Sequence, residues 1–267
     1  MAQPFRILVG IAVVMTWLLL GLLLRLDPNS YLLAGIPLLV IFQLAIARRP
    51  LAQLWLRDAP AFELSPGGWV VAALFMIYPA LSLVEDWRLG SWPVRIWEIT
   101  ATAGAVPLAF ALSHANRRTW MNLLWCFLIA GTIGCAEMLL VSMHRHHGLH
   151  LPPRTGTVFL TNFLLYLPVC FMIEEVFFRG GLDSYIQRDG DRFGWLTAPL
   201  VAALWGWWHL GAVPVRDAIG LVGLIIGLPL VHLIPGVTSS VFWRRSGNLL
   251  VPAAVHSFID SFRNAVM

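Results

Sequence analysis

Six ionisable side chains stand inside strongly apolar stretches of the carboxy-terminal half of this chain. They are Glu174, Glu175, His209, His232, His256 and Asp260. An ionised side chain at membrane depth costs several kcal/mol unless it is paired or reaches water, so such residues are functional-site candidates by default. A carboxylate and two histidines that converge there could hydrolyse a peptide bond. The carboxylate would act as general base on a water, and the histidines would orient that water or donate to the developing oxyanion.

The spacing of the two adjacent glutamates predicts different tasks for them. Glu175 and Arg179 are four residues apart, so on a helix they share a face and can form an ion pair. Glu174 is turned by about 100° from Glu175 on the same helix. We therefore expect a supporting ion pair of Glu175 with Arg179, and a free carboxylate at Glu174.

The histidines differ in the partners that their sequence neighbours offer. His256 and Asp260 are four residues apart, which places the imidazole and the carboxyl on one helix face. His209 follows the aromatic run that begins at Trp205, so we expect it in a water-poor wall. His232 has no partner of this kind, and a structural role is favoured for it.

Composition requires a membrane as the solvent of this chain. Of the 267 residues 58% are hydrophobic and only 12% are charged, whereas soluble globular domains carry about 25% charged residues. All 18 basic residues are Arg, and the net charge of +4 is not gathered into a basic face that would bind nucleic acid. We expect a polytopic membrane protein in contact with lipid and with no nucleic-acid partner.

Helical windows of the length that a bilayer requires recur along the whole chain. We expect an all-α bundle of eight or nine transmembrane helices, and we divide it into amino-terminal helices of unknown role (1–156) and catalytic core helices (157–267). The windows are Ile7–Leu24, Tyr31–Ala47, Trp69–Val84, Thr100–Leu112, Trp120–Met143, Thr157–Phe178, Trp195–Val213, Ala218–Phe242 and Leu249–Val266.

The distribution of arginines predicts the orientation. More of them follow the even-numbered windows than the odd-numbered ones, as at Arg48 and Arg49, Arg117 and Arg118, and Arg244 and Arg245. By the positive-inside rule the amino terminus lies in the cytoplasm. We expect a bacterial inner-membrane protein with the glutamate pair near the cytoplasmic end of the sixth window.

Three motifs in this order resemble those of the CAAX protease and bacteriocin-processing family, also called Abi, of glutamate-dependent intramembrane proteases. They are Glu174-Glu175-x-x-x-Arg179, Trp205-x-x-x-His209 and His256-x-x-x-Asp260. The resemblance covers residues from about 157 to 267. It implies that Glu174 activates the water with the help of His209, that Glu175 and Arg179 support the site, and that His256 and Asp260 line the oxyanion site.

Two departures from the family pattern are visible. The second motif usually opens with Phe where this chain has Trp205, which keeps an aromatic wall. The last position is often Asn where this chain has Asp260. An ionised Asp cannot donate a hydrogen bond, so Asp260 must be protonated or must instead orient His256.

The resemblance implies an endopeptidase without a cofactor. Its substrate would be a peptide or protein, cleaved near its carboxy terminus or at a leader junction, with a lipid or a sorting tail as the recognised feature. A zinc site built from two histidines and two glutamates is the less favoured variant. A non-proteolytic immunity factor, scaffold or transporter that uses the same polar cluster structurally is the alternative from another class.

Glu137 is a further carboxylate inside an apolar window, and it lies outside the three motifs. Two interpretations remain open at this point. The side chain either lines the cavity or pairs with an arginine.

Overall fold

The computed structural model describes residues 2–89, 92–148, 151–188, 190, 194–215 and 217–267. In these ranges the only β-like pairing is a single bridge between Leu56 and Asn248, so the all-α prediction is confirmed. The α-helices are α1 (Gln3–Leu23), α2 (Pro28–Ile41), α3 (Pro66–Leu89), α4 (Trp92–Ser113), α5 (Arg117–Cys126), α6 (Thr132–His146), α7 (Thr155–Val169), α8 (Ser184–Ile186), α9 (Gly194–Trp208), α10 (Ala218–Ser246) and α11 (Leu250–Val266). Short 3-10 or π-helical segments join them: η1 (Phe42–Ile46), η2 (Leu51–Leu54), η3 (Phe127–Gly131), η4 (Val176–Asp183) and η5 (His209–Gly211).

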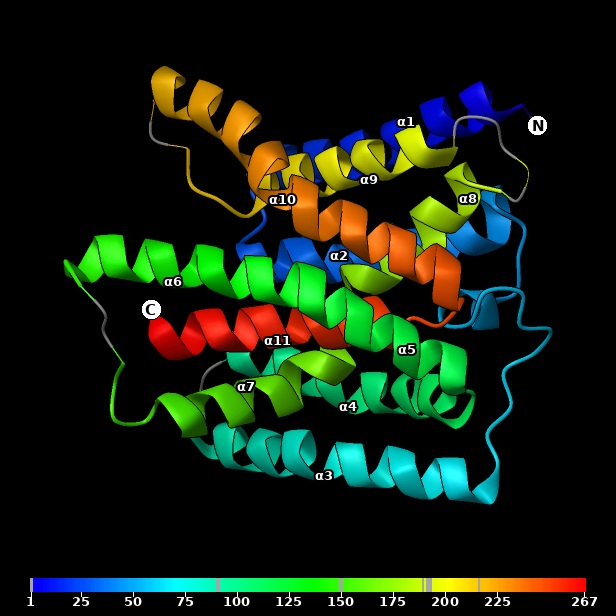
Figure 1. The fold of residues 1–267 in the computed structure, drawn as a ribbon, viewed down its shortest axis with the longest axis horizontal. Coiled ribbons are helices and arrows are strands. Elements are labelled where there is room, and N and C mark those ends of the chain that lie inside the picture. The colour runs from blue at the N-terminus through cyan, green and yellow to red at the C-terminus, as the bar shows by residue number, and fades with distance from the viewer. Residues whose placement is uncertain (1, 90–91, 149–150, 189, 191–193, 216) are drawn as a thin grey trace.

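The long helices lie side by side and run roughly along one axis of the molecule (Figure 1), as expected for a helical bundle. Helix α9 packs against α10, and α3 packs against α4. Helix α11 contacts α7, α5 and α6, which places the last helix inside the bundle. The two ends of the chain lie at opposite ends of this axis.

Polar side chains at the helix ends satisfy backbone groups that the helix itself leaves unpaired. The Asp27 carboxylate accepts hydrogen bonds from the amides of Asn29 and Ser30 at the start of α2. The Ser30 hydroxyl and these amides hold the pKa of Asp27 below its usual range. Asn116 and Thr119 form a capping box at α5, and α10 ends at Gly247, whose φ of 67° suits glycine.

Among the residues that the structure describes, six helical segments are long and apolar enough to cross a bilayer. They are Gln3–Leu23, Pro28–Ile46, Pro66–Trp87, Arg95–Ser113, Arg117–His146 and Ala218–Ser246. Many large apolar side chains on the outside of the bundle are exposed, such as Leu23 (76%) and Ile219 (86%), and such a surface requires lipid. The chain is therefore an integral membrane protein.

All nine predicted windows are helical, but the count of eight or nine spans is not confirmed. Helices α7, α9 and α11 have only 15, 15 and 17 residues, which is short for a helix that crosses a bilayer alone.

The sixth window is not one continuous helix, which corrects the prediction for Thr157–Phe178. Helix α7 ends at Val169, directly after Pro168, and tight turns follow to Ile173. The chain then continues as η4 and α8 to Ile186, so the glutamate pair lies within this path and not at its end. Pro168 has no N–H to donate within α7, and α4 packs closely against the Pro168 carbonyl oxygen.

Gly104 of α4 makes this close approach possible. A Cβ atom at this position would lie 2.0 Å from the carbonyl oxygen of Pro168. We expect Gly104→Ala to lower the free energy of unfolding by about 1–3 kcal/mol, because the two helices must separate. Gly223→Ala is the matched control, since nothing lies within 4 Å of its added methyl group. Thermal unfolding in detergent measures both variants, and equal midpoints would contradict the prediction.

Candidate active site

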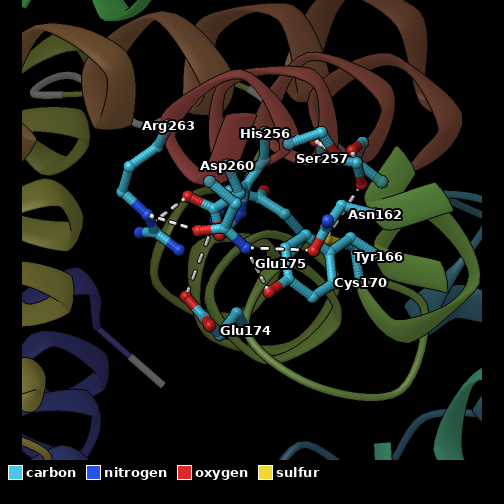
Figure 2. Close-up of polar contacts among 12 residues, drawn as sticks. Asn162, Tyr166, Cys170, Glu174, Glu175, His256, Ser257, Asp260 and Arg263 are labelled. Atoms are coloured by element: carbon cyan, nitrogen blue, oxygen red, sulfur yellow. Dashed lines mark hydrogen bonds and ion pairs between the residues drawn. The ribbon is translucent and has the colours of Figure 1, made fainter. Parts of the chain in front are cut away.

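The backbone at Glu174 has an unusual conformation. Its φ is 51°, in the left-handed region that residues other than glycine seldom adopt. Backbone strain of this kind persists where the surrounding structure imposes it, and it is frequent at functional sites. The consequence here is that Glu174 and Glu175 point in different directions (Figure 2).

A tryptophan from the amino-terminal half supports this turn. The indole N–H of Trp55 donates to the carbonyl oxygen of Phe171 at 2.8 Å, across 116 residues of sequence. Gly180 of η4 lies against the backbone of Leu54, where a Cβ atom would meet the carbonyl oxygen at 2.1 Å. The segment around η2 is therefore packed under the turn that carries the glutamates.

Glu175 and Arg179 form the predicted ion pair, and it is fully buried. Their side chains are 1% and 0% exposed, and Arg179 Nε lies 3.4 Å from Glu175 Oε2. The guanidinium also lies over the ring of Trp205, 4.9 Å from its centroid. The other carboxylate oxygen, Oε1, lies 3.1 Å from Nδ1 of His256. Glu175 thus connects the arginine to the last motif.

Glu174 points into the cavity and meets residues from two other motifs. The indole N–H of Trp205 donates to its Oε2 at 3.2 Å. The same oxygen lies 3.9 Å from Nε2 of His209 and 3.8 Å from Nε2 of His256. These separations are too long for direct hydrogen bonds, but one water can hydrogen bond to both ends of each gap. The Glu174 side chain is 15% exposed, whereas that of Glu175 is 1% exposed, so Glu174 is the one of the two glutamates with access to the cavity.

The position of His209 determines which of its ring nitrogens faces Glu174. Nδ1 lies 2.9 Å from the carbonyl oxygen of Trp205, one helical turn earlier, and a carbonyl can only accept. Nδ1 must therefore carry the proton, which leaves the lone pair of Nε2 directed toward the Glu174 carboxylate. A nitrogen with this lone pair can accept a hydrogen bond from a water.

His256 lies between carboxylates on both of its ring nitrogens. Nδ1 faces Glu175, and Nε2 lies 3.4 Å from Oδ2 of Asp260. The other oxygen of Asp260 lies 3.0 Å from Nη1 of Arg263, three residues further along α11. A doubly protonated ring can donate to both neighbours, whereas the neutral ring can donate only once.

Side-chain hydrogen bonds hold α11 against α7 beside the motif residues (Figure 2). The amide of Asn264 donates to Asn162 Oδ1 at 3.0 Å and to the Tyr166 hydroxyl at 2.7 Å. Two turns earlier, the Ser257 hydroxyl lies 3.3 Å from the Cys170 sulfur. These contacts join α11 to α7 and to Cys170 on the carboxy-terminal side of His256, and no spacing rule in the sequence indicates them.

His232 lies in the site, although the sequence favoured a structural role for it. Its ring centroid is 4.3 Å from that of His209 and 4.6 Å from that of Trp205. Nδ1 pairs with the carbonyl oxygen of Leu228 at 2.7 Å, so Nε2 is directed away from its own helix. The signal that could have indicated this position is the presence of an ionisable residue in an apolar window.

Proline in α10 explains how this helix approaches α9. Pro229 has no N–H, so the carbonyl oxygen of Ile225 lacks its helical donor, and Trp207 donates to it at 2.9 Å. Gly206 allows the contact, because a Cβ atom there would lie 2.7 Å from Pro229. This close approach of the two helices places His232 against the rings of Trp205 and His209.

The motif residues line a cavity of about 400 Å³. Glu174, His209, His256 and Asp260 all contribute to its wall, with His232 and Arg263 beside them. Most of the remaining lining is apolar or aromatic, from α2, α4, α6, α7, α9, α10 and α11. A cavity of this size and character can hold several residues of an apolar peptide or a lipid chain.

The described ranges contain no group of three or more His, Cys, Asp or Glu residues arranged to hold a metal ion. The zinc variant therefore has no ligand set among these residues. The expectation that the chain works without a cofactor stays a prediction.

A family model, type II CAAX prenyl endopeptidase Rce1-like, matches residues 156–262. The matched stretch contains all three motifs, so the resemblance drawn from them is confirmed. No curated protein and no solved structure is significantly similar to the chain.

Proposed function

We propose that this chain, whose residues 156–262 belong to the Rce1-like CAAX protease family, is an intramembrane endopeptidase with a glutamate-activated water. One observation carries the proposal. Oε2 of Glu174 lies within 3.9 Å of the Nε2 atoms of His209 and His256, and the three residues come from three separate segments. A water held between these groups would be polarised by a carboxylate on one side and an imidazole lone pair on the other.

In the proposed reaction Glu174 carries a proton from the attacking water to the leaving amine. The water oxygen attacks the carbonyl carbon of the scissile bond while Glu174 takes a proton from the water. His209 accepts a hydrogen bond from the same water and keeps the water oxygen directed at the carbonyl carbon. When the tetrahedral intermediate collapses, the C–N bond breaks and the proton on Glu174 passes to the leaving amine. The products are a carboxylic acid and an amine, which then exchange a proton to give a carboxylate and an ammonium group.

The oxyanion that forms in this step needs a hydrogen-bond donor. We assign that task to Nε2–H of His256, because Glu175 holds the opposite nitrogen. In the free enzyme this N–H faces Asp260 Oδ2 at 3.4 Å, and the oxyanion would take over from that oxygen as its acceptor. Asp260 is paired with Arg263 and accepts hydrogen bonds only, so its part is to orient His256 and not to donate. We choose the orienting role for Asp260 because of its ion pair with Arg263, which the sequence analysis did not predict.

The substrate class rests on the family and on the cavity. We propose a membrane-associated peptide or protein, cleaved near its carboxy terminus or at a leader junction, with a lipid or an apolar sorting tail in the cavity. The region 157–267 would carry the chemistry and the region 1–156 would support it. The excess of arginines after even-numbered windows supports a cytoplasmic amino terminus. A chain whose basic residues are all Arg, and which is rich in Ala, Leu and Gly, supports a bacterial inner-membrane location.

Purified protein in lipid nanodiscs tests the proposal directly. Peptides with and without a carboxy-terminal prenyl group, and peptides with an apolar tail, would be incubated with it and their masses measured. We expect cleavage at one bond, unchanged after treatment with a strong chelator, because the proposed water is activated by Glu174 and His209. Loss of cleavage on chelation and recovery with zinc would replace this mechanism by a metal one. No cleavage of any peptide by folded protein would contradict the proposal.

A further inference from the structure

Glu137 lies on the wall of the catalytic cavity and has no ionic partner. It stands on α6, nine residues before the end of this helix, within the segment Arg117–His146 that is apolar enough to cross a bilayer. Across the residues that the structure describes, its carboxylate makes no hydrogen bond and no ion pair. An unpaired carboxylate at this depth is costly, so a function in binding charge is the default hypothesis.

The orientation of α6 shows that Glu137 faces the cavity. Ala130, Gly134, Glu137 and Met138 all line it, and their spacing of three and four residues is that of one helix face. Gly134 is pressed against Ile259 of α11, where a Cβ atom would meet the side chain at 2.6 Å. Ile259 directly precedes Asp260, so this face of α6 lies opposite the catalytic part of α11.

The other charged groups of the cavity already have partners. Arg263 is paired with Asp260, and Glu174 accepts from Trp205. Arg263 therefore does not neutralise Glu137, and among the described residues the open alternative of an arginine partner is not supported. The surrounding wall is mainly apolar, which strengthens the attraction of a carboxylate for any cation that enters.

We propose that Glu137 is a specificity-determining residue that binds an Arg or Lys side chain of the substrate beside the scissile bond. This inference rests on the proposed function, because it assumes that a peptide occupies the cavity. The positive charge of the substrate side chain would pair with the Glu137 carboxylate. The apolar stem of that side chain would lie along the cavity wall. A peptide with a neutral side chain at that position would leave the carboxylate unpaired and would be cleaved more slowly.

Kinetics with matched peptides test the inference. Peptides carrying Arg, its neutral isostere citrulline, or Glu at each position around the scissile bond would be cleaved by the wild type, Glu137→Gln and Glu137→Arg. We expect the wild type to prefer Arg over citrulline at one position by about 10- to 100-fold in kcat/KM, as for a hydrogen bond to a charged group. Glu137→Gln removes this preference without slowing the citrulline peptide, and Glu137→Arg favours the Glu peptide.

Ala136→Gln is the control, because it adds the same amide on the exposed side of α6. It should keep the preference for Arg. A wild type that cleaves Arg and citrulline peptides equally at every position would overturn the inference, as would a Glu137→Gln variant that slows both peptides alike. Absence of cleavage of all peptides by the wild type would instead contradict the proposed function.

Discussion

Glu174→Gln is expected to lower kcat for peptide cleavage by about 10²- to 10⁴-fold, the range that loss of a general base produces. The amide has the shape of the carboxylate and its oxygen can still accept from Trp205, which donates to Glu174 at 3.2 Å. It cannot take a proton from water. Because the wild-type side chain lies on the cavity wall, the fold should not depend on its charge. Product masses at several substrate concentrations give kcat, and thermal unfolding in detergent reports the fold.

A double variant distinguishes a shared water from two independent contributions. If Glu174 and His209 act on one water, the variant Glu174→Gln/His209→Ala should be no slower than Glu174→Gln alone, since residues that act as a unit are not additive. Glu63→Gln is the matched control, because this glutamate is exposed and lies outside the catalytic cavity. Full activity of Glu174→Gln would remove the proposed base.

Arg179→Met is expected to destabilise the protein by about 3–5 kcal/mol, as for the loss of one partner of a buried ion pair. The guanidinium is 0% exposed and its partner Glu175 is 1% exposed, so no water can replace the lost charge. Methionine fills part of the volume over Trp205 but leaves the carboxylate uncompensated. Thermal or denaturant unfolding in detergent measures the loss.

Removing both charges should restore most of this stability. In Glu175→Gln/Arg179→Met neither charge is buried alone, and the Gln oxygen can still accept from Nδ1 of His256. Arg245→Met serves as the surface control, because Arg245 is exposed and should contribute little. If Arg179→Met unfolds at the same midpoint as the wild type, the pair has no structural role.

The apolar windows alone determine that this chain is an all-helical membrane protein. Each is long enough for several helical turns, and a backbone in lipid must satisfy its own hydrogen bonds, which leaves the helix as the available structure. The pair of Glu175 and Arg179 also follows from the sequence, because a spacing of four residues brings side chains together on any helix. The convergence of Glu174, His209 and His256 could be expected from their cost in lipid and from the family motifs.

Only the tertiary structure decided how these groups meet. The left-handed turn at Glu174 follows the end of α7, where Gly104 lies against Pro168 and Trp55 donates to Phe171 across 116 residues of sequence. Helical periodicity carries no information about such contacts, because they join residues from distant parts of the chain.

The same reason explains the residues that the sequence left undecided. His232 enters the site because Pro229 and Gly206 let two helices touch. Asp260 pairs with Arg263, and our proposal of an orienting role for Asp260 rests on that pair. Glu137 could have paired with an arginine or faced the cavity, and the rotation of α6 against Ile259 decided between the two. Composition and spacing determine which residues are costly in lipid, whereas packing between helices determines which partner offsets that cost.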